Sequence, residues 1–331
     1  MSQLRMGFIG AGGNARGHGK RLLAAGGADI RALADPSEKS IADFGEAVLN
    51  GNPRPAVYAD YREMLAKEKL DAVLISSPHT LHCDQVLDCL RAGLHVLAEK
   101  PLACSRGETE KILGELEKTD RHLVVSFQRR LKAVYRYMRH FVRSPEFGRP
   151  MTVASFVSQA WLKSQTGTWR QKMSLSGGGQ LNDTGAHIID MVMWMLDDEV
   201  AEVSAFIENR GREVDIDSAV SYRTRGGAVG TLTVMGSSPK CPMWEDMTIN
   251  GEGGSAFFYR RGKLWVVRDN SGEFVEEEIR GEDLDPDRHF VDVVTGKAEN
   301  ESPPRDFLRN IKFTEAAWAS AANGGKPVAL A

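Results

Sequence analysis

The stretch Leu94–Ala103 reads LHVLAEKPLA, and its apolar half stops at three consecutive residues, Glu99, Lys100 and Pro101. A short apolar run without polar alternation is typical of a strand buried on both faces of a parallel sheet. Two charges therefore stand where such a strand leaves the sheet, which is the edge at which open α/β folds bind ligands. The alternative is a solvated loop whose proline ends the strand, and this stretch alone does not decide between the two.

Strand and helix patterns alternate on both sides of this stretch, up to about residue 125. The expected strands are 5–9, 29–34, 72–75, 94–98 and 123–127, and the expected helices are 14–25, 60–67, 81–92 and 106–119. Regular βα units with short turns predict an α/β domain with a doubly wound parallel sheet covered by helices on both faces.

A glycine-rich turn follows the first expected strand. Residues 10–15, GAGGNA, fit the pattern G-x-G-x-x-A through Gly10, Gly12, Gly13, Asn14 and Ala15. Between a strand and a helix, glycines let backbone N–H groups approach a pyrophosphate at the positive end of the helix. We therefore expect a dinucleotide site here.

An aspartate ends the second expected strand. Asp35 lies about 20 residues beyond the glycine motif, where an acid binds the hydroxyls of an adenosine ribose. The alternative is a helix cap before Ser37. An unmodified ribose indicates NAD, and the nearby Arg16 and Lys39 keep NADP open.

The segment after the strand at 72–75 is rich in polar groups. Ser76, Pro78, His79 and His82 are candidates to flank the dinucleotide. Serine and proline are also common turn residues after a strand, so a purely structural role is the alternative.

The second half of the chain changes to longer, alternating strands joined by short turns. The expected strands are 151–159, 203–208, 219–223, 229–235, 246–250, 255–259, 264–268 and 273–279. This pattern predicts an α+β domain with a large, mostly antiparallel open sheet. We expect domains at 1–125 and 126–302, and a C-terminal helix and tail at 303–331 that packs back on the first domain.

One face of that sheet lacks enough helices to cover it. We expect apolar residues such as Val157, Phe206, Leu232 and Val234 to meet another subunit, which predicts a homodimer or homotetramer.

A second polar constellation follows the glycines at 177–179. Asp183 and His187 are four residues apart and Asp190 follows three later, so a helix would place all three on one side. An imidazole beside a carboxylate suits proton transfer near neutral pH. The alternative is an N-cap aspartate and a core histidine.

Composition narrows the class of protein. The 331 residues are 42% hydrophobic and 26% charged with a net charge of −3, which is ordinary for a soluble protein and gives no reason to expect nucleic acid or a membrane surface as partner. The amino terminus carries no apolar signal segment, and Cys83, Cys89, Cys104 and Cys241 form no C-x-x-C pair. We expect a cytoplasmic protein with reduced thiols and no metal.

Three motifs in this order, the glycine turn, Glu99-Lys100-Pro101 and Gly177–Gly179 followed by Asp183-x-Gly185-x-His187, resemble the Gfo/Idh/MocA family of glucose-fructose oxidoreductases and inositol dehydrogenases. The resemblance implies a Rossmann domain followed by a substrate domain with an open sheet. It implies oxidation or reduction of a sugar, inositol or related polyol with NAD or NADP. His79 stands where the family often has asparagine, and the segment 127–130 matches only loosely.

The resemblance also implies roles for single residues. Lys100, Asp183 and His187 match the family's catalytic positions, with either Lys100 or His187 as the primary acid/base. Glu99 and Arg170 are expected near the cofactor, and the bond before Pro101 is expected to be cis. Trp161 and Trp169 are expected to bind substrate together with Lys100, Asp183 and His187; a place in the core is their alternative.

Two other functions remain open. An NAD-using glycosidase would oxidise a sugar carbon transiently, eliminate the glycosidic bond and reduce again. A non-catalytic NAD-binding regulator would need neither Lys100 nor His187. The sequence does not identify the sugar or the direction of reaction.

Overall fold

The computed structural model describes residues 3–50, 52–239, 243–259, 263–269 and 271–330. The chain forms two compact units. The first comprises Met1–Ala103, Gly107–Gln128 and Leu284–Arg305; the second comprises Cys104–Arg106, Arg129–Asp283 and Asp306–Ala331. The expected boundary near residue 125 lies close to the observed one, but a segment after residue 283 returns to the first unit.

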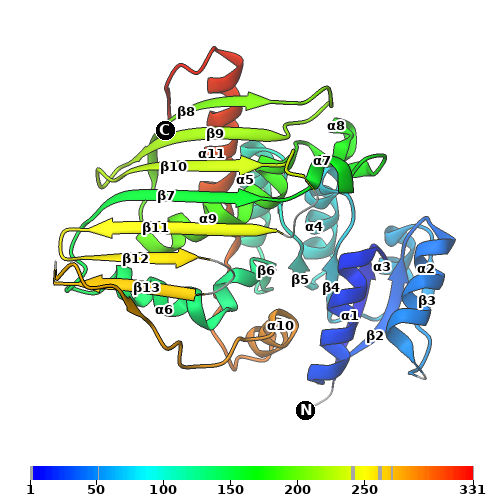
Figure 1. Ribbon diagram of the computed structural model, residues 1–331. Helices are drawn as coiled ribbons and strands as arrows, with labels where there is room; N and C mark the ends of the chain where they lie inside the picture. Colours follow the sequence, from blue (N-terminus) through cyan, green and yellow to red (C-terminus); the bar gives the residue numbers. More distant parts are fainter. Residues whose placement is uncertain (1–2, 51, 240–242, 260–262, 270, 331) are drawn as a thin grey trace. The chain divides into compact units, whose positions relative to one another are not determined.

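The first unit contains a six-stranded parallel sheet in the order β3-β2-β1-β4-β5-β6, with helices packed along it (Figure 1). Its strands are β1 Leu4–Ile9, β2 Ala28–Ala34, β3 Ala56–Tyr58, β4 Ala72–Ile75, β5 His95–Ala98 and β6 Leu123–Val125. Its helices are α1 Gly13–Ala25, α2 Glu38–Phe44, α3 Tyr61–Lys67, α4 His82–Arg91, α5 Arg106–Leu116 and α10 Pro286–Val294, with short π or 3₁₀ turns η1 Gly45–Leu49 and η2 His79–Leu81. The 3₁₀ turn η3 Gln128–Leu131 begins at the last residue of one segment of the first unit and continues into the second. The strand order reverses between β1 and β4, so the segments that follow these two strands meet at the switch point of the sheet.

Helix α10 is the part of the first unit that the sequence analysis missed. Phe290, Val291 and Val293 are buried in the same core as the α1 residue Leu22. The start of the helix was predictable from the sequence, because an aspartate followed by a proline is a typical helix start. In the structure Asp285 caps the helix by accepting from two backbone N–H groups. Its position in the first unit was not readable from a pattern local to the chain.

The second unit contains a nine-stranded sheet in the order β14-β13-β12-β11-β7-β10-β9-β8-β15. Its strands are β7 Pro150–Ser158, β8 Val200–Glu208, β9 Asp217–Thr224, β10 Val229–Met235, β11 Trp244–Gly251, β12 Gly254–Tyr259, β13 Lys263–Arg268, β14 Val275–Glu276 and β15 Val328–Ala329. Its helices are α6 Ala133–Val142, α7 Trp161–Ser164, α8 Met173–Ser176, α9 Ala186–Leu196 and α11 Pro304–Ala322, with short turns η4 Trp169–Gln171 and η5 Leu181–Gly185. Neighbouring strands are antiparallel apart from the β7–β10 pair, as the alternating pattern predicted.

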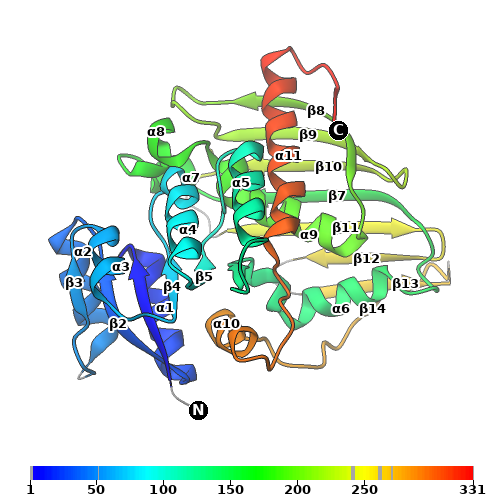
Figure 2. The same cartoon turned by 180° about the vertical axis from the view of Figure 1, so that it is seen from behind.

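Helices α6, α9 and α11 lie on one face of this sheet (Figure 2), and no helix of the described residues covers strands β8 to β13 on the face nearest the viewer in Figure 1. The four residues expected on the open face divide between the two faces. Val157, Leu232 and Val234 are buried with the helices, whereas Phe206 is 69% exposed. Because side chains alternate along a strand, the open face is instead lined by their neighbours, such as Val229 and Met235.

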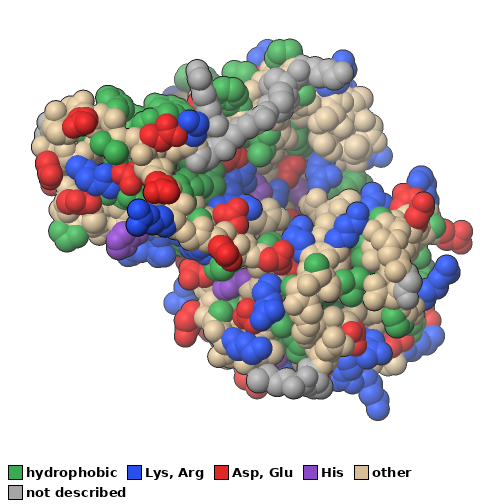
Figure 3. Space-filling view, turned by 60° about the horizontal axis from the view of Figure 1, so that its bottom comes forward, with side chains coloured by type: hydrophobic (Ala, Val, Ile, Leu, Met, Phe, Trp, Pro, Cys, Tyr) green, Lys and Arg blue, Asp and Glu red, His purple; other side chains and the backbone are tan. Residues whose placement is uncertain are grey.

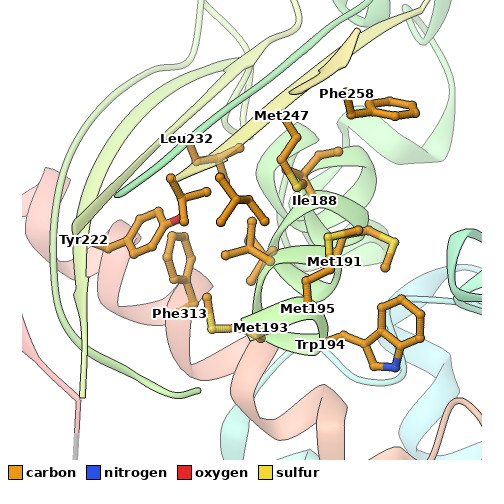
Figure 4. Packing of buried hydrophobic residues seen from close by; sticks show 14 of the residues in the cluster. Ile188, Met191, Met193, Trp194, Met195, Tyr222, Leu232, Met247, Phe258 and Phe313 are labelled. Atoms are coloured by element: carbon orange, nitrogen blue, oxygen red, sulfur yellow. The ribbon is translucent and has the colours of Figure 1, made fainter. Parts of the chain in front are cut away.

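The last long helix belongs to the second unit, which corrects the expectation that it packs on the first domain. Phe313 of α11 meets Tyr222 of β9 edge to face, with 5.4 Å between ring centroids. Figure 4 shows this pair beside the methionines of α9, a helix buried on all sides over residues 186–195. The helix that carries His187 in its first turn is therefore a core helix.

Other sequence-based expectations concern the chain as a whole. No helix among the described residues has both the length and the apolar character needed to cross a membrane. Lys and Arg side chains are interspersed with Asp and Glu over the described residues of the face in Figure 3. Cys83, Cys89 and Cys104 hold no disulfide, and Cys241 lies outside the described residues.

Replacing Phe313 with alanine should lower the free energy of unfolding of the second unit by about 3–5 kcal/mol, because it leaves a cavity beneath the sheet. All six tryptophans belong to this unit, so their fluorescence during urea denaturation reports on it alone. Phe206→Ala is the control, since its 69% exposed ring should cost about 0.5 kcal/mol or less. Equal losses in the two variants would contradict the packing of α11.

Candidate active site

The glycine turn after β1 has the geometry of a phosphate cradle. Gly10 has φ +96°, and a Cβ there would lie 2.6 Å from the Ser76 carbonyl oxygen, so only glycine fits. Gly12 is the N-cap of α1 and has no side chain that could accept from the first N–H groups of the helix. A Cβ at Gly12 or Gly13 would meet no described atom within 4 Å. The first N–H groups of α1 therefore face open space at the positive end of the helix, which fits a dinucleotide pyrophosphate.

The two other residues of the motif occupy opposite sides of the first turn of α1. Asn14 is exposed beside the open space, whereas Ala15 is fully buried in the core of the unit. The small Ala15 side chain lets the helix pack closely on the sheet, which is the usual requirement at the last position of this motif.

Asp35 is fixed at the end of β2 by two backbone donors. Its Oδ2 accepts from the Ala11 N–H at 2.8 Å, and its Oδ1 accepts from the Ser37 N–H at 2.8 Å. Ser37, rather than Asp35, is the N-cap of α2. Each carboxylate oxygen keeps a lone pair, so the carboxylate is anchored beside the glycine turn and can still accept from ribose hydroxyls.

The two cations that kept NADP open are both paired with one carboxylate. Asp43 Oδ2 lies 3.4 Å from the Arg16 guanidinium and 2.9 Å from the Lys39 amine. A 2′-phosphate would have to compete with Asp43 for both cations, so this arrangement favours NAD.

The polar segment after β4 lies at the switch point of the sheet. The Ser76 N–H donates to the Ile9 carbonyl at 2.8 Å, which ties the segment to the glycine turn. Pro78 is half-buried, and the buried His79 ring lies 5.8 Å from the His82 ring. These contacts keep Ser76, Pro78 and His79 as candidates beside a bound dinucleotide.

His82 is not available to a cofactor in this arrangement. The ring is fully buried, with Nδ1 2.8 Å from the Pro101 carbonyl and Nε2 3.0 Å from the Ser77 carbonyl. Burial lowers the pKa of His82, so the ring is neutral and donates to one of the two oxygens at a time. We interpret His82 as a support for the E-K-P turn instead of a cofactor ligand.

The Lys100–Pro101 peptide bond is cis, which confirms the expectation from the sequence. The Lys100 side chain is half-buried, and its backbone N–H donates to Glu99 Oε2 at 3.2 Å. Glu99 is 3% exposed, and its carboxylate is hydrogen-bonded within the first unit, so it holds the turn and is not positioned to bind a cofactor directly.

Asp183 and His187 flank the junction between a π turn and α9 in the second unit. Asp183 lies on η5 and is 7% exposed; His187 lies in the first turn of α9 and is 8% exposed. Single π turns within helices are frequent at functional sites. A buried acid and a buried imidazole so close in the chain form a candidate proton-transfer pair.

Side chains from α7 and η4 contact the Asp183 carboxylate. Trp161 Nε1 donates to Asp183 Oδ2 at 3.0 Å, and Arg170 Nε lies 3.4 Å from the same oxygen. The Arg170 guanidinium also lies 4.5 Å from the centre of the Trp169 ring. Trp169 and Arg170 therefore lie near Asp183 in the second unit.

Trp161 corrects an expectation about the substrate. Its ring is 1% exposed and packs against Val214 and Ile216, so it cannot stack on a sugar. It is instead a core residue that orients Asp183. Trp169 remains half-buried and keeps the expected role open.

Asp190 does not join Asp183 and His187 as their spacing in a regular helix suggested. Its two oxygens accept from the Arg130 guanidinium at 2.5 and 2.9 Å, and Arg130 also pairs with Asp306 on α11 at 2.7 Å. This buried network joins α9 to α11, so Asp190 is structural.

Asp215 is a residue of this region that the sequence analysis missed. Its carboxylate accepts from the Gly179 and Leu181 N–H groups at 2.9 and 2.7 Å and from Trp318 Nε1 at 3.0 Å. A Cβ on Gly179 would lie 1.9 Å from the Asp215 carbonyl oxygen, which explains a glycine there. The available signal was a single acid between two apolar residues, Val214 and Ile216.

Comparison with known proteins agrees with this geometry. Residues 4–127 match the "Oxidoreductase family, NAD-binding Rossmann fold", and residues 135–257 match the "GFO/IDH/MocA C-terminal domain". The chain belongs to the Gfo/Idh/MocA family. The resemblance seen in the sequence is thereby confirmed, and the first unit is the NAD-binding domain of an oxidoreductase.

Individual relatives of this Gfo/Idh/MocA protein include both dehydrogenases and a glycosidase. An inositol 2-dehydrogenase/D-chiro-inositol 3-dehydrogenase from Halalkalibacterium halodurans is 27% identical over 91% of this chain and 86% of the relative. A glycosyl hydrolase family 109 protein from a Shewanella species is 27% identical over 56% of this chain and 42% of the relative. A levoglucosan dehydrogenase in complex with NADH shares the fold, with a TM-score of 0.87 at 20% identity over the whole of both chains.

Replacing Asp35 with alanine should weaken NAD binding roughly 10- to 100-fold, because a charged hydrogen-bond acceptor for the ribose is lost. NADP should lose much less, since a 2′-phosphate gains nothing from a nearby carboxylate. Isothermal titration calorimetry with both nucleotides measures the difference. Asp43→Asn is the matched control, which should leave NAD affinity unchanged while releasing Arg16 and Lys39 for NADP. Equal losses of both nucleotides in the Asp35 variant would indicate a purely structural aspartate.

Proposed function

We propose that this oxidoreductase transfers a hydride between NAD and a CH–OH or ketone carbon of a sugar, inositol or related polyol. The observation that carries the proposal is the buried pair Asp183 and His187 at the start of α9, where Asp183 is already held by Trp161 and Arg170. Titratable groups kept this far from water are candidates for proton transfer. The inositol dehydrogenase relative supports the choice of substrate class.

His187 is proposed as the group that exchanges the hydroxyl proton. During oxidation the C–H bond breaks with its electron pair, the O–H bond gives its proton to the imidazole, and a C=O bond forms. Bound NAD supplies the hydride acceptor. In the reverse direction His187 returns the proton to the carbonyl oxygen.

Lys100 is proposed to stabilise negative charge on the substrate oxygen while that proton moves. A lysine amine is a compact cation with three donors, so it suits a developing alkoxide. Asp183 is proposed to orient the imidazole, and Trp169 with Arg170 to contact the substrate or the nicotinamide end of the cofactor. The family resemblance implied that Lys100, Asp183 and His187 are catalytic, and the chemistry of each side chain suggests this division of roles.

The proposal is tested by cofactor absorbance with a panel of aldoses, inositols, ketosugars and nucleotide sugars. Lys100→Met should reduce hydride transfer on the best substrate by roughly 100-fold or more, because an electrostatic stabiliser of the transition state is lost. NAD affinity should change little, since the Lys100 backbone bond to Glu99 does not need the amine. Lys118→Met, at a side chain 69% exposed, is the control.

The glycosidase alternative gives a different result in the same screen. A chromogenic glycoside would be cleaved without accumulation of reduced nicotinamide, because the oxidation is reversed within each cycle. The glycosidase relative supports the glycosidase alternative less than the inositol dehydrogenase relative supports the dehydrogenase, since the matched region spans only 42% of the glycosidase relative's length. Normal turnover by Lys100→Met, or no turnover of any polyol or sugar, would contradict the dehydrogenase proposal.

A homo-oligomer formed through the open face of the second unit's sheet is also proposed. Aromatic rings cluster near one edge of the face. The distances between ring centroids are 5.0 Å for Phe257 and Phe274, 6.2 Å for Phe257 and Tyr259, and 6.2 Å for Tyr259 and Trp265. Phe206 and Val229 add exposed apolar surface on β8 and β10. A second copy of the chain would remove this apolar surface from water.

Val229→Glu should convert that oligomer to monomer, because the substitution would bury a charge in the interface. Sedimentation velocity at several protein concentrations measures the change. Val57→Glu, at a 52% exposed position of β3 in the first unit, is the matched control. A wild-type chain that sediments as a monomer at every concentration would refute the proposal.

A further inference from the structure

His18 is a fully buried polar residue on the core-facing side of α1. It lies three residues after Ala15, and it shares that side of the helix with Gly19 and Leu22. Its side chain is 1% exposed. An ionisable group in this position needs partners, because an unpaired polar group in a core is costly.

Both nitrogens of the His18 ring face carboxylates. Nε2 lies 2.8 Å from Glu99 Oε1, and Nδ1 lies 2.6 Å from Asp287 Oδ1 on α10. A neutral imidazole has one N–H, so it would set a lone pair against one of the two carboxylates; the imidazolium donates to both. Burial opposes the charged form, but the hydrogen bonds to Asp287 and Glu99 outweigh it and raise the pKa of His18 to about 9.

Other charged groups balance this bridge. Arg21 of α1 donates to Asp287 Oδ2 at 2.7 Å and lies 3.8 Å from Asp285 at the start of α10. On the opposite side, the charges of His18 and Lys100 and the hydrogen bond from His18 outweigh burial and lower the pKa of Glu99. Glu99 and Asp287 are thus each ion-paired with His18, and Arg21 lies against Asp287 as a further cation.

The Glu99 carboxylate connects His18 to the E-K-P turn, which comprises Glu99, Lys100 and Pro101. Its Oε2 accepts from the Lys100 backbone N–H at 3.2 Å, and its Oε1 accepts from Gln128 Nε2 at 3.2 Å as well as from His18. With the carboxylate fixed by donors on two sides, the direction in which the chain leaves β5 is also fixed. The side chain of Lys100 starts from that backbone.

We propose that His18 is a positioning residue for the turn Glu99–Pro101, acting through the Glu99 carboxylate and joining α10 to the turn through Asp287. Its effect on hydride transfer rests on the proposed function; the bridge itself does not. The role was not predicted because nothing in the sequence pairs residue 18 with residues 99 and 287.

The protonation of His18 is measured directly by NMR on the full chain labelled with ¹⁵N at its 8 histidines, with His18→Gln identifying the signal. We expect both ring nitrogens to stay protonated until the pH approaches about 9. Loss of a ring proton near the ordinary histidine pKa of about 6.5 would overturn the bridge. If a single histidine signal keeps both ring protons up to about pH 9, the wild-type spectrum alone carries the result.

Thermal unfolding across pH 6 to 10 gives a second measurement without substrate. The folded-state pKa of His18, about 9, lies above the unfolded value, so its contribution is fully present below about pH 6.5 and is lost as the pH rises through about 9. The melting-temperature advantage of wild type over His18→Gln should therefore be greatest at pH 6 and shrink by pH 10. A difference that does not change with pH would contradict the bridge.

Hydrogen exchange of the peptide that contains residues 99–103 tests the positioning role. His18→Gln should speed exchange in this turn roughly 10-fold, because Glu99 loses its strongest donor. His289→Gln is the matched control: His289 is a buried histidine of α10, 6% exposed, whose pKa is lowered by burial and whose Nε2 accepts from the Glu301 N–H. Equal exchange in His18→Gln and wild type, or an equal effect of His289→Gln, would overturn the proposal.

Where an active substrate is found, His18→Gln should lower kcat roughly 10- to 100-fold while the NAD Kd changes by less than about threefold. The substrate screen and the kcat of His18→Gln distinguish failure of the proposed function from failure of the positioning role. Failure of every substrate would refute the proposed function and leave the three substrate-independent results to decide on His18. A wild-type kcat in His18→Gln would refute the positioning role even in an active dehydrogenase.

Discussion

A carboxylate buried at the end of a parallel strand is the constraint on which the first unit depends. Glu99 follows β5 directly and cannot reach water, so it must be satisfied by donors from within the unit. His18 supplies one from α1, Gln128 supplies another after β6, and the Lys100 N–H supplies a third. The helix that begins at the phosphate cradle and the turn that carries the lysine are therefore parts of one hydrogen-bonded assembly.

The second unit uses the same solution at its own glycine-rich segment. Asp215 accepts from two backbone N–H groups of the loop at 179–181 and from Trp318 on α11. Burial raises the pKa of Asp215, and these donors act against that rise. A loop rich in glycine has many conformations to lose on folding, and a buried acceptor selects one of them. The π turn bearing Asp183 begins at the last residue of this pinned loop.

The sequence contained the local features of this fold but not its long-range pairings. Strands β4 and β10 end where the apolar runs predicted, because burial on both faces or on alternate positions leaves a direct trace in the residue pattern. The assignment of α10 and α11 to units was not predictable, since an apolar helix side in the sequence does not specify which core it enters. For Trp161 the sequence left a substrate contact and a place in the core open, and the choice depended on a partner distant in the chain, because its Nε1 donates to Asp183.

Two buried histidines hold the E-K-P turn, and their surroundings give them opposite charge states. His82 meets carbonyl oxygens, which carry no net charge, so burial prevails and the ring is neutral. His18 meets two carboxylates, whose attraction exceeds the cost of burying a cation. An apolar cluster could hold α1 and α10 against the sheet at least as firmly as this charged bridge. Apolar contacts are non-directional, however, whereas the hydrogen bonds of an imidazolium fix the orientation of the Glu99 carboxylate. For the proposed role of Lys100, which must present its amine to a reacting oxygen, a fixed orientation of the turn matters more than added stability.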